Sequence, residues 1–222
     1  MCTFCTDAVP NADGRMRIVS GVDLGLQAWL TREDDPLDRA RFLAIQDRPF
    51  GALGNKPEGG LWTSTLVQPE TGASSAWVAA ATEMNLHGDR DVLWVATPDP
   101  GARIAVVDSI VDLVAVQAIY PRSMHREFAR PGIDFYQAAQ DGLDAIHLTE
   151  AGQYATRYTH PLDLYGWDCE CTLWLRWAFT STAQHLGPVI RPPRPRDRDD
   201  DGTWHPDRDP DSDAHPYQHT AG

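Results

Sequence analysis

Two acidic residues, Asp168 and Glu170, stand one residue apart within the segment Trp167-Asp168-Cys169-Glu170. The β-prone residues from Cys169 to Leu175 predict that Glu170 lies in a strand. Because side chains alternate along a strand, the two carboxylates would share one face, and Cys169 and Cys171 would share the other. A carboxylate pair can act as general acid and base, or stabilise a positive charge that develops in a transition state. The alternative is an edge strand with solvated carboxylates.

The surroundings of this acidic pair favour chemistry. Residues 149–165 show no clear periodicity and are expected to form a long loop, a kind of segment that often serves a site. Tryptophans at positions 167, 174 and 177 bracket the pair and could form the walls of a pocket. This context favours a site at the acidic pair over a solvated edge strand.

A second polar segment runs from Asn55 to Thr65, with the sequence Asn-Lys-Pro-Glu-Gly-Gly-Leu-Trp-Thr-Ser-Thr. Its two glycines allow close backbone approach, its hydroxyl groups supply donors and acceptors, and Lys56 carries the only ammonium side chain of the chain. Such a segment could hold an anion. It contains neither a Walker A loop nor a Rossmann fingerprint. An ordinary loop that leads into a strand is the alternative.

The order of these parts resembles that of ADP-ribosyltransferases, which bind NAD in a cleft between two small sheets. Trp62-Thr63-Ser64-Thr65 resembles the Ser-Thr-Ser element of that family, and Asp144-Ala145-Ile146-His147 resembles the strand before its catalytic segment. Asp168-Cys169-Glu170 resembles its Glu/Gln-x-Glu motif, although Asp168 departs from the pattern, so that the choice of target does not carry over. The segments around Lys56-Pro57 and Gly-Trp-Asp-Cys-Glu also resemble proteins of actinobacteria and their phages.

The resemblance implies an α+β fold with a split of two small sheets and flanking helices, and NAD as a substrate. Glu170 would bind the 2′-hydroxyl of the nicotinamide ribose and stabilise an oxocarbenium-like sugar, while Asp168 would orient or deprotonate the acceptor. The acceptor would be a protein or a nucleic acid. The first cofactor-binding motif has no clear counterpart, with Arg17, Arg41 and Gln46 as candidates. The cofactor site would comprise Lys56, Gly60, Trp62, Thr63, Ser64, Thr65, Trp77 and Gln46.

The cysteines fall into two close pairs, Cys2/Cys5 and Cys169/Cys171. Four thiolates at these spacings could in principle close a zinc site. Buried or incidental thiols are the alternative, and disulfides are not expected in a reducing compartment.

Two histidines stand outside the motifs discussed so far. His147 lies between Ile146 and Leu148 in an expected strand, which is typical of a satisfied core or rim histidine. His125 belongs to a locally basic patch, residues 122–130, which could touch nucleic acid or simply form a solvated helix end.

Composition predicts one domain and a tail. Hydrophobic residues make up 42% of the 222 residues and eight residues are Trp, which is enough for one core. Residues 187–222 are rich in Pro, Asp and Arg, so burial there cannot offset the entropy of ordering, and a disordered tail is expected. Residues 1–186 would form the single α+β domain.

Charge and hydropathy narrow the classes of function. The net charge of −13 argues against binding nucleic acid over the whole surface, but is compatible with a local basic groove. No apolar run is long enough to cross a membrane and no secretion signal is recognisable, which predicts a cytoplasmic location without membrane partners. A non-enzymatic adaptor and a small zinc-stabilised domain remain as alternatives to an enzyme.

The apolar patterns predict mixed secondary structure. Turn residues and potential N-caps, among them Ser74-Ser75 and Asp108-Ser109, mark the element ends. The expected strands are 17–21, 41–45, 61–67, 92–95, 102–107, 145–148 and 169–175, and the expected helices are 24–30, 76–84, 109–119 and 133–139.

Overall fold

The computed structural model describes residues 15–32, 37–47, 55–67, 74–84, 86, 91–122, 131–180 and 184–188. Cys2, Cys5 and His125 lie outside the described residues, as does the predicted tail beyond Pro188. The described elements, in chain order, are β1 (Arg17–Val19), α1 (Gly21–Leu24), β2 (Gln27–Arg32), η1 (Arg39–Arg41), β3 (Leu61–Val67), β4 (Ser74–Ser75), α2 (Ala76–Glu83), β5 (Asp91–Ala96), β6 (Ile104–Val107), α3 (Ile110–Ile119), α4 (Phe135–Gln140), β7 (Ala145–Leu148), α5 (Glu150–Thr156), β8 (Cys171–Trp174) and β9 (Gln184–Pro188).

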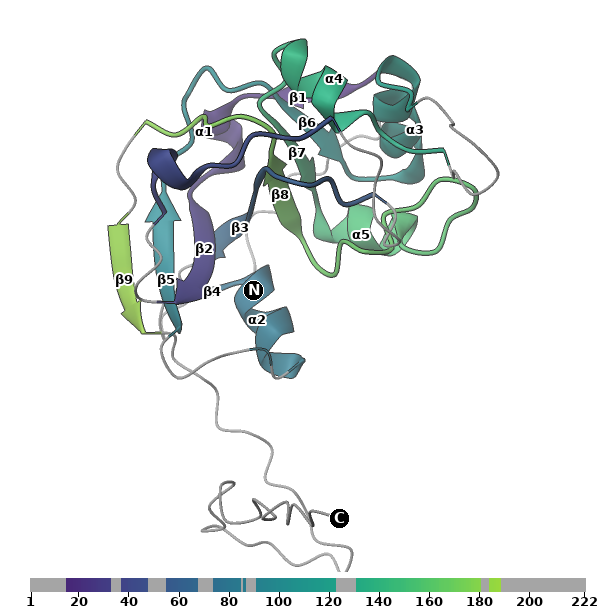
Figure 1. Cartoon of the computed structure of the whole chain (residues 1–222). Helices are drawn as coiled ribbons and strands as arrows, with labels where there is room; N and C mark the ends of the chain where they lie inside the picture. Colours follow the sequence, from purple (N-terminus) through teal and green to yellow (C-terminus); the bar gives the residue numbers. More distant parts are fainter. Residues whose placement is uncertain are drawn as a thin grey trace, which may run out of the picture. The chain divides into compact units, whose positions relative to one another are not determined.

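The strands join into one mixed sheet rather than the two small sheets that the resemblance implied (Figure 1). Eight strands follow the order β1-β6-β7-β8-β3-β2-β5-β9, and β4 pairs with β3 beside this path. Continuity depends on β3, whose first half pairs with β8 through Thr63 and whose second half pairs with β2 through Ser64 and Thr65. A seven-residue strand without Gly or Pro can bridge both halves. The α+β class is confirmed, and the split into two sheets is wrong.

Strand alignment places one row of side chains across five neighbouring strands. Arg17 pairs with Val106, Val106 with His147, His147 with Thr172, and Thr172 with Thr63. Residues that pair directly point to the same face of a sheet. The row therefore brings an arginine, a histidine and two threonines to one face.

The opposite face of these strands is apolar and covered by helices. Ala105, Ile146 and Leu173 point to it and pack in one buried cluster with Leu113 of α3 and Phe135 of α4. Figure 1 shows α3 and α4 on the same side of β6 and β7. Helices therefore close this face, and the polar row lies on the other one.

Local sequence explains where the helices α2, α3 and α5 begin. Ser75 accepts a hydrogen bond from the N–H of Val78 and starts α2, and Ser109 likewise starts α3, as their N-capping roles predict. Thr149 caps α5 in the same way. The longest described helix, α3, has ten residues, and no helix in the described ranges is long and apolar enough to cross a membrane.

Several expected elements differ from those observed. Residues 24–30 do not form a helix, because Gly25 has a φ of 77° and ends α1, and β2 then pairs with β5 along its whole length. Residues 41–45 are not a strand: Arg41 is the last residue of η1, and residues 42–45 form a loop. Residues 149–165 contain α5, a helix that their lack of periodicity concealed. β9 extends into the expected tail, because it includes Gly187 and Pro188, the first two residues assigned to that tail.

Gly60 lets the loop before β3 press against β8. It has a φ of 76°, and a Cβ atom there would lie 2.8 Å from both the carbonyl oxygen of Trp174 and Cδ1 of Leu173. The N–H of Gly60 donates to the carbonyl of Leu43 at 2.7 Å. Glycine is therefore required by backbone geometry and packing.

We predict that Gly60→Ala lowers the free energy of unfolding by about 3 kcal/mol or more, because left-handed strain and overpacking add. Gly142→Ala is the matched control, since Gly142 has a φ of 81° but its Cβ would meet only the ends of two arginine side chains at 3.4 and 3.5 Å. That variant should lose only about 1 kcal/mol. Urea unfolding of both variants measures the difference, and equal losses would contradict the packing role of Gly60.

Candidate functional site

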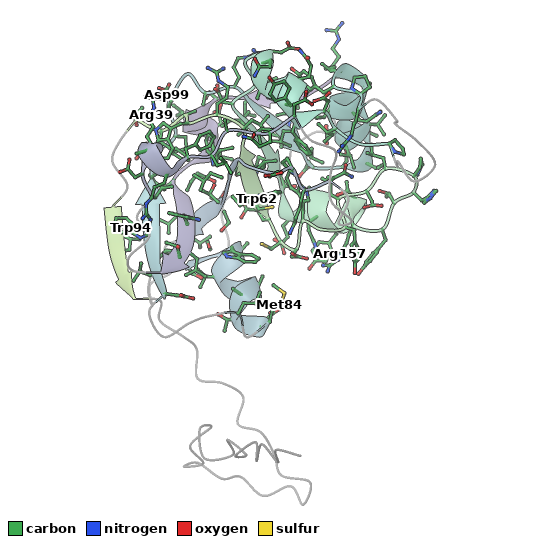
Figure 2. The ribbon with its side chains drawn as sticks, viewed as in Figure 1. Arg39, Trp62, Met84, Trp94, Asp99 and Arg157 are labelled. Atoms are coloured by element: carbon green, nitrogen blue, oxygen red, sulfur yellow. The ribbon has the colours of Figure 1, made fainter. Side chains whose placement is uncertain are left out.

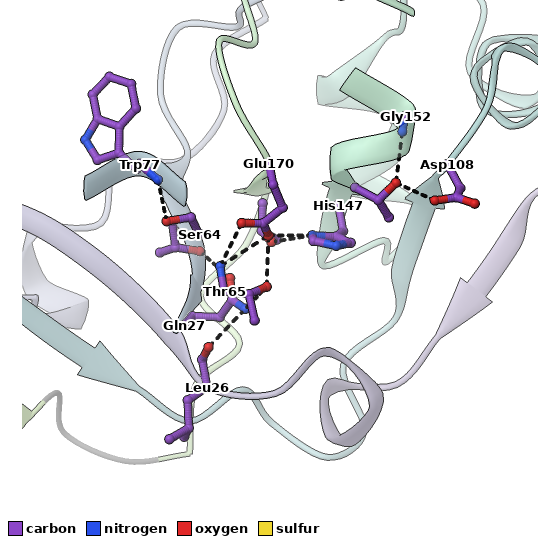
Figure 3. A network of polar contacts seen from close by, with 12 residues as sticks. Leu26, Gln27, Ser64, Thr65, Trp77, Asp108, His147, Gly152 and Glu170 are labelled. Carbon is purple, nitrogen blue, oxygen red and sulfur yellow. Dashed lines mark hydrogen bonds and ion pairs between the residues drawn. The ribbon is translucent and has the colours of Figure 1, made fainter. Parts of the chain in front are cut away.

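Glu170 lies immediately before β8, which is a central strand of the sheet rather than an edge strand. Its side chain is 14% exposed. Thr65 of β3 binds it twice: the hydroxyl donates to Oε1 at 2.8 Å, and the backbone N–H lies 3.2 Å from both carboxylate oxygens (Figure 3). Within the described part of the chain, the backbone N–H of Thr65 is the sole hydrogen-bond donor to Oε2. One oxygen is thus held firmly, and the other has capacity for a further donor.

A series of buried hydrogen bonds connects Trp174 to Thr65 and orients the Thr65 hydroxyl. Nε1 of Trp174 donates to the Thr63 hydroxyl at 2.8 Å, and that hydroxyl donates to Oε1 of Gln27 at 2.7 Å. Nε2 of Gln27 in turn lies 3.5 Å from the Thr65 hydroxyl. Because each group satisfies the next, the Thr65 hydroxyl is oriented toward Glu170.

His147 of β7 completes the network and was not predicted as a site residue. Its Nδ1 lies 2.9 Å from the Thr172 hydroxyl and 3.6 Å from Oε1 of Glu170 (Figure 3). The expectation of a satisfied histidine is confirmed by the Thr172 contact. The sequence carries no local signal for its place beside Glu170, because β7 and β8 meet only through their pairing.

Burial moves the pKa values of the two titratable groups in opposite directions. Loss of solvation raises the pKa of Glu170 to about 7, against the hydrogen bonds from Thr65, which lower it, while Glu150 raises it further. Loss of solvation also lowers the pKa of His147 to about 4, with a further decrease from Arg17 and an opposing increase from Asp108. At neutral pH the imidazole is therefore uncharged while the carboxyl group titrates.

Arg17 of β1 stands in the same row as His147. Its positive charge is close enough to lower the pKa of His147, and its Nε is enclosed by the protein without a hydrogen-bond partner in the described ranges. An enclosed N–H donor without a partner is costly unless a ligand or water satisfies it. Arg17 is thus a candidate contact for an anionic group.

Asp168 does not share the contacts of Glu170. Its carboxylate lies 3.4 Å from Nζ of Lys56, and that ammonium lies 5.7 Å from the ring centre of Trp62. The predicted common face assumed a strand from Cys169 onward, but β8 begins only at Cys171, so alternation does not extend to the two acidic residues. Lys56 and Asp168 form a partly exposed ion pair instead.

The other residues expected at the cofactor site have structural contacts. Trp62 packs edge-on against Trp167 at 4.7 Å, in the cluster on the helix-covered face. Ser64 is buried and accepts the N–H of Trp77, whose ring extends away from the Glu170 network (Figure 3). Nε2 of Gln46 donates to the carbonyl of Ala44, within its own loop.

Cys169 and Cys171 are free thiols, and burial raises the pKa of both, that of Cys169 to about 12. Protonated thiols are weak nucleophiles and poor metal ligands. No cluster of three or more potential metal ligands occurs among the described residues. The predicted four-thiolate zinc site also needs Cys2 and Cys5, which lie outside them, so it stays a prediction.

A surface hollow of about 550 Å³ lies away from this network. It is reached from the end of β8 opposite to Glu170, and Figure 2 labels Arg39, one of its lining residues. None of its lining residues belongs to the Glu170 network; they are Arg39, Phe42, Ala44, Ile45, Ala139, Gln140, Leu175, Arg176 and Trp177.

Comparison with known proteins shows no relationship. No family model matches the chain, and neither the curated proteins nor the solved structures contain a significant match.

Glu170→Gln should stabilise the protein at alkaline pH. The carboxyl pKa rises from 4.5 to about 7 on folding, so the native state holds a proton between these values that the unfolded chain releases. Native stability therefore falls as pH rises through this window, by up to about 3 kcal/mol, and the amide variant escapes the loss. Melting temperatures of variant and wild type should agree near the acid end and diverge at about pH 8.5. Glu83→Gln, at an exposed carboxylate of α2, serves as the charge control, and a pH-independent difference for Glu170→Gln would refute the burial cost.

Proposed function

We propose that this chain is an NAD-dependent ADP-ribosyltransferase that transfers ADP-ribose to a protein or nucleic-acid acceptor. The observation that carries the proposal is the buried carboxylate of Glu170, fixed through Oε1 by the backbone and hydroxyl of Thr65 while Oε2 keeps acceptor capacity. The resemblance to the family makes both segments part of the site, and the hydrogen bonds between Thr65 and Glu170 support that proposal.

The chemistry requires a fixed negative charge. Breakage of the bond between C1′ of the ribose and the nicotinamide nitrogen sends the electron pair to nicotinamide, which leaves uncharged, and puts positive charge on the sugar. Oε2 of Glu170 would accept a hydrogen bond from the ribose 2′-hydroxyl and stabilise that charge as it develops. A nucleophile of the acceptor then bonds to C1′ and releases a proton.

Two cationic side chains support binding of a dinucleotide. Arg17 lies in the row that contains His147, and its enclosed Nε has no hydrogen-bond partner among the described residues. Lys56 is a partly exposed ammonium group at the start of segment 55–60, which precedes β3. Either could contact the diphosphate. Thr63 and Ser64 would support the site through the sheet, because their hydroxyl groups already have protein partners.

The rate of nicotinamide release should rise with pH and reach half of its maximum near pH 7, because the reaction needs ionised Glu170 and its pKa is about 7. Initial rates at NAD concentrations well below KM measure kcat/KM across the pH range and therefore report the titration of the free protein. A flat profile over this range would show that ionisation of Glu170 does not limit the reaction.

Glu170→Gln should lower nicotinamide release by about a hundredfold or more, because an amide cannot supply the negative charge that stabilises the sugar. The experiment incubates the protein with NAD labelled in the nicotinamide ring and follows free nicotinamide. Glu83→Gln makes the same substitution at an exposed carboxylate at the end of α2 and should retain activity within about threefold.

Two outcomes decide against the proposal: no nicotinamide release by the wild type under any acceptor tested, or equal rates in wild type and Glu170→Gln. The first would favour the non-enzymatic adaptor.

A further inference from the structure

Nδ1 of His147 faces the same oxygen of Glu170 that receives the Thr65 hydroxyl, just beyond hydrogen-bond distance. Nδ1 of the imidazole lies 3.6 Å from Oε1, and the Thr65 hydroxyl lies 2.8 Å from the same atom. β7 pairs with both β6 and β8, and the His147 side chain is 11% exposed, so the ring has little freedom to move. Glu170 is thus bound on one side by Thr65 of β3 and faces the rigid imidazole of His147 on β7.

We propose that His147, uncharged and carrying its proton on Nδ1, is a positioning residue that holds Oε1 of Glu170 so that Oε2 is presented to the substrate. The catalytic consequence rests on the proposed ADP-ribosyl transfer, but the orientation of the carboxylate does not. His147 acts through Glu170 and contacts no reacting atom itself.

The Thr172 hydroxyl, 2.9 Å from Nδ1, allows both tautomers, because a hydroxyl can accept a hydrogen bond from Nδ1–H or donate one to an unprotonated Nδ1. Glu170 decides between them. An unprotonated Nδ1 would turn its lone pair toward a carboxylate oxygen 3.6 Å away, which is repulsive, whereas the N–H that donates to Thr172 keeps its positive end near that oxygen. Ionisation of Glu170 therefore selects the Nδ1–H form.

The groups around His147 and Glu170 keep the imidazole of His147 neutral. Arg17 on β1 disfavours the imidazolium, as burial does, and Asp108 after β6 opposes them. Glu150 on α5 acts on Glu170, and Lys56 and Asp168 act on the neighbouring thiol of Cys169. A neutral donor orients the carboxylate and leaves its negative charge in place. An imidazolium would neutralise that charge.

Two substitutions separate this role from simple packing. His147→Asn places an amide nitrogen at the position of Nδ1 and retains a donor, whereas His147→Leu fills similar space without one. Loss of the donor destabilises ionised Glu170, so the pKa of Glu170 should rise by about one unit in the leucine variant and return to within about 0.3 units of wild type in the asparagine variant. The acid limb of the rate profile should move by the same amount, with kcat about tenfold lower and KM little changed in the leucine variant.

The measurement that carries the test is NMR of the full chain without NAD. Carboxyl-labelled glutamate reports the Glu170 titration, assigned by the signal that disappears in Glu170→Gln, and ¹⁵N-labelled histidine reports the tautomer of His147 in the wild type. A neutral Nδ1–H imidazole at pH 7.5 is expected, and an imidazolium or an Nε2–H tautomer overturns the proposal whether or not the leucine variant folds.

An identical pKa of Glu170 in the wild type, His147→Leu and His147→Asn would also overturn the proposal. If Glu170 titrates as expected but the wild type releases no nicotinamide, the positioning role stands and the proposed enzymatic function fails. The two inferences can therefore fail separately.

Discussion

The site depends on one physical conflict, the burial of the Glu170 carboxylate against the three hydrogen bonds that Thr65 offers it. Removing a carboxylate from water is costly unless donors replace the lost solvation. The contacts from Thr65 offset only part of that cost, since the pKa of Glu170 stays at about 7 despite them. The rest of the lost solvation free energy is not compensated, so a positively charged or hydrogen-bond-donating ligand would stabilise the ionised carboxylate of Glu170. Such uncompensated burial is typical of functional sites rather than of structural ion pairs.

The sheet makes this arrangement rigid, and β3 is the element through which it does so. Alternation sends Thr63 and Thr65 to the polar face, where they join Gln27 and Glu170, and sends Trp62 and Ser64 to the face covered by helices. Adjacent side chains of the Thr-Ser-Thr run therefore perform different tasks. Two threonines belong to the series of buried hydrogen bonds, while Ser64 accepts the N–H at the start of α2. The run therefore forms the frame of the candidate site, because its hydroxyl groups all have protein partners.

The two carboxylates that first suggested chemistry have separate environments. Glu170 is enclosed and bound by neutral donors, whereas Asp168 is partly exposed and paired with Lys56. An exposed ion pair contributes little to stability and is weakened by salt. The contrast assigns the strongly perturbed group to the centre of the site and leaves Asp168 at its margin. It also removes the thiols from consideration as nucleophiles, because burial holds Cys169 and Cys171 in the protonated form.

Sequence patterns alone determined the local features: the strands at 61–67 and 145–148 and the capping serines Ser75 and Ser109. They also indicated Glu170 as a candidate for chemistry, which stays a prediction. These depend on neighbours in the chain, which a sequence displays directly. The single sheet, the helix α5 and the place of His147 were decided by the tertiary structure. His147 reaches Glu170 only because β7 pairs with β8 in one particular alignment, and a shift by one residue would turn its ring into the apolar core. Strand order and alignment arise from contacts between distant residues, so no local pattern encodes them.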